Sequence, residues 1–164
     1  MLYYLLLPLL SILLIVLQST IADILFSGRL VFEISLIAVV YAGFRFDLIR
    51  GAILAFVLGF LWDCIGGSVL GVYTFIYIGI FFFAFFTADF LDIEKKYVVA
   101  FFCFFCALLK EIVLALFYYL VFKINVLVNT YFIFIVQALF AGLFAPVFFY
   151  LMDRAEVFFY GEKE

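Results

Sequence analysis

Three ionisable residues stand inside long apolar stretches of this 164-residue chain: Asp63, Lys110 and Glu111. On insertion scales a charged side chain at the centre of a membrane helix costs about 2.5 to 3.5 kcal/mol, so it needs a partner or water. Such residues are candidates for binding a ligand or a proton, and a buried polar clamp between helices fits equally well. The residue types leave both functions open.

Lys110 and Glu111 lie near the midpoint of the apolar run 97–122. Neighbouring positions on a helix point about 100° apart, so we expect that these two side chains do not pair directly on one face. Each is expected to meet a polar group elsewhere in the protein. The candidates for that group are Gln18, Asn125, Gln137 and Asp63.

Asp63 opens the segment Asp63-Cys-Ile-Gly66-Gly67-Ser68, which separates two apolar stretches. A carboxylate beside a turn accepts hydrogen bonds from nearby backbone amides. We therefore expect Asp63 to bond turn amides, including those around Gly66 to Ser68, and so to fix a helical hairpin whose turn is Gly66-Gly67. Binding of a ligand or proton is the alternative.

The chain has few residues suited to metal binding, catalysis or nucleic-acid binding. The chain has no histidine, and Cys103 and Cys106 lie one helical turn apart in an apolar run, where we expect them to pack as small residues; the third cysteine is Cys64. This predicts neither a metal site nor a cofactor. Phosphate loops and nucleophile motifs are missing, so no enzyme is predicted. Nine dispersed basic residues and a net charge of −3 argue against nucleic acid as a partner.

The composition predicts the kind of helix that carries these residues. With 72% hydrophobic residues, the chain would expose far more apolar surface than a soluble protein tolerates. We predict an all-α integral membrane protein with one polytopic domain, residues 1–164, in contact with the lipid bilayer. About six transmembrane helices are expected, at approximately 2–22, 30–44, 51–65, 69–88, 97–122 and 131–152.

The basic residues predict the orientation, because loops rich in Lys and Arg stay in the cytoplasm. With six spans and a cytoplasmic N-terminus, six basic residues face the cytoplasm and two face outward, which favours both termini inside. The cytoplasmic set is Arg45, Arg50, Lys95, Lys96, Arg154 and Lys163, and the outer set is Arg29 and Lys123.

Small residues recur at four-residue spacing at Gly51, Ala55 and Gly59, on one face of the third expected helix, and Gly67 and Gly71 continue the pattern. A face without large side chains lets another helix backbone approach closely. We expect this face to pack inside the protein, and a docking face for a partner's helix is the alternative.

The stretch GFLWDCIGGSVLGVY, residues 59–73, resembles the rod shape-determining protein MreD family, whose most recognisable segment reads approximately G-x-x-x-D, a few residues, then G-x-x-L-G. The resemblance extends to Leu17-Gln18-Ser19-Thr20 and to the chain length. At Phe32-Glu33-Ile34 the chain departs from the Pro-Asp-Leu-like entry that the family often has, so Glu33 matches that acidic position weakly.

The resemblance implies a non-enzymatic scaffold in the bacterial cytoplasmic membrane that takes part in cell-shape determination and guides lateral peptidoglycan synthesis. Its implied partner is an MreC-like single-span protein, within an assembly with RodA, a class B penicillin-binding protein and MreB. The hypothesis for its mechanism is that the Gly51/Ala55/Gly59 face and the Gly67/Gly71 turn hold a partner's helix.

The alternative function is transport. The chain is similar in size and span number to the substrate-binding subunits of energy-coupling-factor vitamin transporters, and Asp63, Lys110 and Glu111 would then line a small-molecule pocket. Such pockets gather several polar groups on an apolar lining, and the chain offers few. The alanine motif with which those subunits engage their membrane partner is not evident either.

Overall fold

The computed structural model describes residues 34–66, 69–92, 95–123 and 127–160, and every regular element in these ranges is a helix. The elements are α2 (Ile34–Arg45), α3 (Leu48–Gly66), α4 (Val72–Thr87) with the short 3₁₀ turn η1 (Ala88–Phe90), α5 (Lys96–Phe122) and α6 (Leu127–Tyr160). The predicted span 2–22 lies outside the described residues, as do Gln18, Glu33, Gly67, Ser68 and Asn125.

Three described segments are long and apolar enough to cross a membrane: Val72–Phe90, Lys96–Phe122 and Phe132–Arg154. A helix satisfies its own backbone hydrogen bonds, which a membrane interior demands. The all-helical prediction is therefore confirmed for the described part of the chain, while the number of six crossings stays a prediction. Helix α6 is longer than the predicted span 131–152 at both ends.

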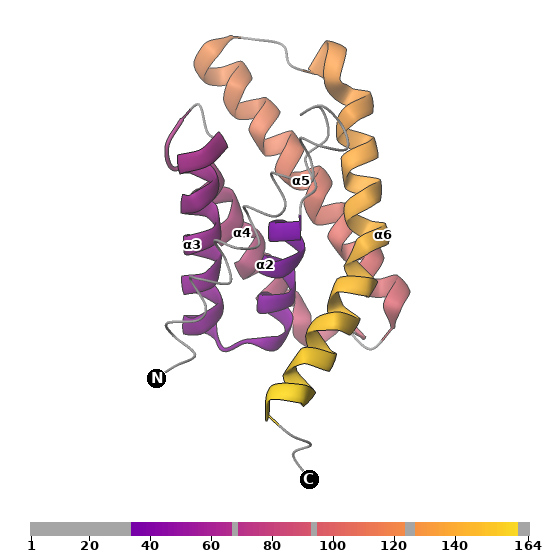
Figure 1. Cartoon of the computed structure of the whole chain (residues 1–164). Helices are drawn as coiled ribbons and strands as arrows, with labels where there is room; N and C mark the ends of the chain where they lie inside the picture. Colours follow the sequence, from indigo (N-terminus) through magenta and orange to yellow (C-terminus); the bar gives the residue numbers. More distant parts are fainter. Residues whose placement is uncertain (1–33, 67–68, 93–94, 124–126, 161–164) are drawn as a thin grey trace.

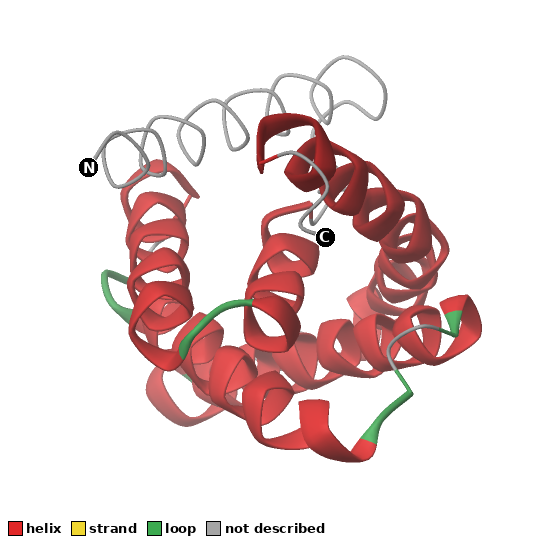
Figure 2. Ribbon diagram, turned by 90° about the horizontal axis from the view of Figure 1, so that it is seen from below, coloured by secondary structure: helices red, strands yellow, loops and turns green. Residues whose placement is uncertain are grey.

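The helices form two hairpins with α2 between them. Helices α3 and α4 pack along each other, as do α5 and α6, whereas the contacts that join one hairpin to the other are sparse. Figure 1 shows α3 and α4 on one side, α6 on the other, and α5 crossing obliquely. Seen from below, α2 lies at the centre of the arrangement (Figure 2).

Helix α2 is buried on almost every side. Leu36, Val39, Val40 and Ala42 have no exposed surface, and α2 contacts each of the four other long helices. Its closest approach is to α4, where a Cβ added to Gly43 would lie 2.6 Å from the Cβ of Ala84. This helix therefore joins the two hairpins.

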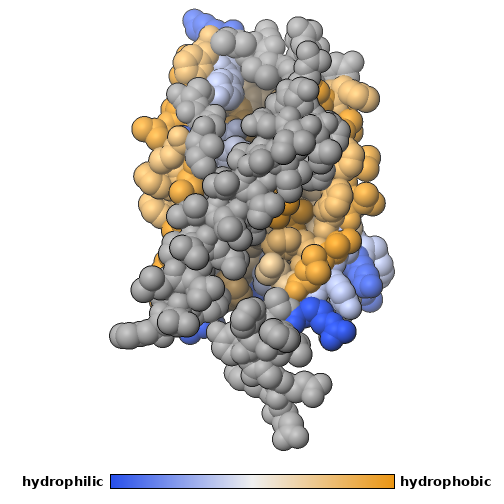
Figure 3. Space-filling model, in the orientation of Figure 1, coloured by the Kyte–Doolittle hydropathy of each residue, from blue (hydrophilic) through white to orange (hydrophobic). Residues whose placement is uncertain are grey.

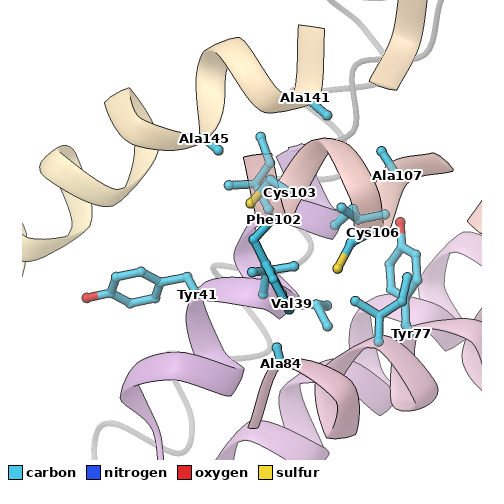
Figure 4. Close-up of a cluster of buried hydrophobic side chains, with 14 of the residues drawn as sticks. Val39, Tyr41, Tyr77, Ala84, Phe102, Cys103, Cys106, Ala107, Ala141 and Ala145 are labelled. Atoms are coloured by element: carbon cyan, nitrogen blue, oxygen red, sulfur yellow. The ribbon is translucent and has the colours of Figure 1, made fainter. Parts of the chain in front are cut away.

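The core where the hairpins meet contains small residues and aromatic rings. Figure 4 shows Cys103 and Cys106 of α5 with Ala141 and Ala145 of α6 on one side, and with Val39 of α2 and Ala84 and Tyr77 of α4 on the other. Both cysteines are fully buried and unbonded to each other. They pack as small residues, as the sequence predicts.

Apolar side chains cover the visible flanks of the molecule, and hydrophilic residues gather toward its ends (Figure 3). At the end that carries the α2–α3 connection, the Tyr41 hydroxyl donates to Asp153 Oδ1 at 3.1 Å and the Arg45 guanidinium donates to Oδ2 at 3.3 Å. These bonds link α2 to α6. The pattern is that of a bundle with a lipid-facing surface and polar ends.

Candidate functional site

A cleft of about 200 Å³ lies between the two hairpins. One side comes from α3 and α4 and the other from α5 and α6. The lining residues are Trp62, Tyr73, Tyr77, Lys110, Glu111, Phe134 and Gln137. Among the described polar groups expected to meet Lys110 and Glu111, Gln137 lines this cleft and Asp63 does not.

Lys110 and Glu111 form an ion pair, with 2.7 Å between Nζ and Oε1, and each is only 6% exposed. The expectation that these neighbours do not pair is wrong. Their Cα–Cβ bonds diverge around the helix, but the flexible four-carbon stem of lysine can bend back toward the carboxylate. The pair places both charges in the lining of the cleft.

Trp62 and Tyr73 form an aromatic wall of the cleft. Their rings are stacked, with centroids 5.9 Å apart and planes inclined by 24°. The Trp62 Nε1–H group donates to Ser35 Oγ at 2.7 Å, and that oxygen is also bonded to the Tyr77 hydroxyl at 2.8 Å. Because Ser35 is completely buried on α2, it holds α3 and α4 in register at the cleft.

Sequence reasoning missed Ser35. One small polar residue in a short apolar run carries little signal of its own. A better signal is the single tryptophan of the chain, Trp62, because a buried indole N–H almost always finds an acceptor.

Asp63 links α3 to the start of α4 at the tip of the α3/α4 hairpin. Its Oδ1 accepts the Tyr73 N–H at 2.9 Å, and its Oδ2 accepts the Thr74 N–H at 3.0 Å and the Thr74 hydroxyl at 2.5 Å. These amides belong to the first turn of α4, whose N–H groups have no partner within the helix. The carboxylate, 1% exposed, therefore caps α4 from α3. The described bonds fall on α4, while Gly67 and Ser68 of the predicted set lie outside the described residues.

The small-residue face of α3 lies against α4. A Cβ added to Gly59 would lie 2.5 Å from Thr74 Cα, and one added to Gly51 would meet the ring of Phe81; Ala55 is completely buried. The face therefore packs inside the protein. A partner's helix cannot occupy the same face while α4 covers it.

Glycines outside that face have other roles. Gly71 has φ of 98°, a conformation that favours glycine, and an added Cβ would meet no described atom within 4 Å, so it shapes the entry to α4 and makes no close contact. Gly142, which sequence reasoning did not single out, brings α6 onto α5: an added Cβ would lie 2.9 Å from the Ala100 carbonyl oxygen.

The lining of the cleft contains groups that form hydrogen bonds. It presents an ammonium, a carboxylate, a carboxamide and phenol groups beside aromatic rings. Among the described residues, no group of three or more cysteine, aspartate or glutamate side chains could hold a metal ion.

Comparison with known proteins gives one match. The family model of the rod shape-determining protein MreD matches residues 1–155. No curated protein and no solved structure matches the chain.

Proposed function

Since the chain belongs to the MreD family of rod shape-determining proteins, we propose that it is a non-enzymatic membrane scaffold that guides lateral peptidoglycan synthesis. The family assignment makes it a membrane protein involved in rod shape determination. The match over residues 1–155 of 164 carries the proposal, because it covers nearly the whole chain. Transport, the alternative function, gains no support from this assignment.

The scaffold is proposed to lie in the bacterial cytoplasmic membrane, to cross it about six times and to keep both termini in the cytoplasm. The three long apolar helices support several crossings. The distribution of Lys and Arg supports the orientation. In this arrangement the α3–α4 turn faces outward, and the α2–α3 and α4–α5 connections face the cytoplasm.

The proposed partner is an MreC-like single-span protein, within an assembly with RodA, a class B penicillin-binding protein and MreB. Connections between the described helices are short, so a partner meets the protein mainly on its helices. Helices associate in lipid where small residues let backbones approach. The Gly51/Ala55/Gly59 face is already used by α4, so the partner needs another surface.

The outer face of α4 around Gly79 is the surface that we propose. Gly79 is exposed, and a Cβ added there would meet no described atom within 4 Å. Phe75, one turn before it, is 77% exposed, and Phe86, two turns after it, is 65% exposed. The glycine leaves a notch between large rings, into which a helix backbone can fit.

Substitution at Gly79 tests the proposal. Gly79→Leu fills the notch. We expect it to lower the amount of an MreC-like protein that co-purifies from native membranes in mild detergent by about tenfold or more. A tenfold loss corresponds to about 1.4 kcal/mol of binding free energy. Cys64→Leu is the matched control, because it adds bulk at another exposed position and should leave recovery unchanged. Unchanged recovery with Gly79→Leu, at unchanged expression, would refute the proposed surface.

A further inference from the structure

We propose that the second half of α6, residues 147–160, is a hinged arm that opens and closes against α2. Pro146 is the hinge, and the two hydrogen bonds that Asp153 accepts from α2 are the latch that holds the arm closed. The latch lies at the end of the bundle that carries the α2–α3 connection. This inference rests on contacts within the chain and does not depend on the scaffold role.

Pro146 weakens the backbone in the middle of α6. A proline has no backbone N–H, so the carbonyl of Gly142, four positions earlier, does not receive the helical hydrogen bond, and the proline ring crowds that carbonyl. Sharp bends in helices occur mostly at such positions. Figure 1 shows α6 changing direction about midway along its length, so that its second half turns toward α2.

The part of α6 before the hinge is fixed on α5, and the arm extends past the start of α5. A Cβ added to Gly142 would lie 2.9 Å from the Ala100 carbonyl oxygen, which places these two residues at the same level of the hairpin. Lys96, the first residue of α5, is only four residues from Ala100, about 6 Å of helix. Asp153 is 11 residues from Gly142 along α6, about 16 Å.

Past the start of α5, the arm packs on α2. The ring of Tyr41 lies edge-on to that of Phe149, with centroids 5.0 Å apart and planes inclined by 82°. The Tyr41 hydroxyl donates to Asp153 Oδ1 at 3.1 Å, and the Arg45 guanidinium donates to Oδ2 at 3.3 Å. Both carboxylate oxygens of Asp153 therefore accept a bond from α2.

The latch bonds determine whether the arm stays on α2, because a membrane gives the ring contacts little driving force. Lipid tails are as apolar as the rings, so they can replace the contact between Tyr41 and Phe149 when the arm moves away. The side chains of Arg45 and Asp153 are 44% and 43% exposed. Water or a charged group of a binding partner can therefore reach the latch and shift the arm between its two positions.

Distances between two nitroxide labels, measured by pulsed electron paramagnetic resonance, test the proposal. The full-length protein is placed in phosphatidylcholine nanodiscs, with labels on Ile49→Cys at the start of α3 and on Arg154→Cys in the arm, two exposed positions. Cys64→Ser removes the exposed native cysteine, and the other two cysteines are buried. A control pair carries the second label on Leu139→Cys, an exposed position of α6 before the hinge.

The variants separate the latch from the hinge. Asp153→Ala removes both latch bonds, and at about tenfold for each bond the ratio of open to closed arms rises about 100-fold, so a second distance appears. Tyr41→Phe keeps the ring and should raise the ratio about tenfold. Asp153→Ala/Pro146→Ala restores the backbone N–H and should give a single distance. Asp89→Ala removes an exposed carboxylate outside the latch and should leave the distance unchanged.

A second distance that appears in the latch variants for the arm pair, and disappears when Pro146→Ala is added, supports the proposal. It is overturned if both latch variants keep the distance of the unaltered protein, if the Leu139 pair changes in the same way, or if two distances persist with Pro146→Ala. Tyr41→Phe retains its ring packing, so it tests the latch even where Asp153→Ala fails to fold. Recovery of an MreC-like partner is a separate measurement, so either proposal can fail alone.

Discussion

The two hairpins of this protein solve the problem of polar groups in an apolar environment differently. In the α3/α4 hairpin the buried charge of Asp63 is bonded to the backbone of the neighbouring helix at the tip. In the α5/α6 hairpin the buried charges of Lys110 and Glu111 are bonded to each other and border the cleft between the hairpins. The first arrangement fixes a turn, and the second furnishes a cavity.

This difference shows how a buried charge can be assigned a role before any function is known. A carboxylate that accepts three hydrogen bonds from one neighbouring segment has its acceptor capacity used for structure. The charge pair of Lys110 and Glu111, by contrast, lies in the lining of the cleft between the hairpins. The two hairpins therefore differ in the contacts that their buried charges make, more than in how deep those charges lie in the bundle.

The largest effect should come from breaking the charge pair on one side only. Lys110→Met removes the ammonium that lies 2.7 Å from the buried Glu111 carboxylate, and we expect it to destabilise the protein by about 3 to 5 kcal/mol. Lys110→Met/Glu111→Met should lie close to the unaltered protein. Thermal unfolding in detergent measures both. If the double variant is as unstable as the single one, the pair is structural and the contrast between the hairpins disappears.

Removal of the Asp63 carboxylate should be the next largest effect. Asp63→Ala leaves the Tyr73 and Thr74 amides without their acceptor, at roughly 1 to 3 kcal/mol for each buried donor. We expect a loss of about 3 kcal/mol in the same unfolding assay, with little change at Asp89→Asn, which is exposed. A loss of stability below about 0.5 kcal/mol, as for a surface substitution, would contradict the role of Asp63 in capping α4.

Adding one methyl group at a glycine tests how tightly the helices pack within each hairpin. Gly59→Ala forces the new Cβ against the backbone of α4 at 2.5 Å and should cost about 2 kcal/mol. Gly142→Ala meets α5 at 2.9 Å and should cost about 1 kcal/mol. Gly79→Ala meets no described atom and is the matched control. Equal losses at Gly59 and Gly142 would show that the two hairpins tolerate added volume alike.

The smallest effect is expected in the connection between the hairpins. Lys95 Nζ donates to Asp92 Oδ2 at 2.7 Å, and this hydrogen bond, helped by the attraction of the lysine charge, lowers the pKa of Asp92 below its ordinary value of 3.8. A lowered pKa means that the contribution of the pair is present above pH 3.8 and is lost as the pH falls through the folded value.

Because both side chains are exposed, we expect a shifted titration of Asp92 without a measurable change in unfolding temperature. Carbon NMR of the Asp92 carboxyl measures the shift, and Lys95→Met should return its pKa toward the ordinary value. A clear fall in unfolding temperature with Lys95→Met would mean that the connection, and not α2, joins the hairpins.

Sequence reasoning succeeded where a single physical requirement of a residue type determines the structure around it. The apolar composition required helices, the close spacing of Gly51 and Gly59 required a tight helix contact, and Asp63 beside a turn required amide partners. In each case the demand is local or belongs to one helix face. The family resemblance at residues 59–73 was confirmed by the match over residues 1–155.

Sequence reasoning failed where a contact depends on side-chain flexibility or on three helices at once. The direct bond between Lys110 and Glu111 depends on how a long side chain bends, which helix geometry does not fix. The hydrogen bonds that meet at Ser35 join α2, α3 and α4, and no spacing in the chain relates these positions. The cleft itself exists because two hairpins touch sparsely, which only the assembled fold determines.

The position of α2 at the centre of the bundle has a consequence for biosynthesis. A chain is made from its N-terminus onward, so α2 is complete before any of the helices that later surround it. Until α3 and α4 have been made, Ser35 lacks its hydrogen bonds to Trp62 and Tyr77. The last helix made, α6, is also bonded to α2 through Asp153. Truncated or stalled chains therefore lack the bonds that α2 makes with later helices, and we expect membrane quality-control proteases to recognise them.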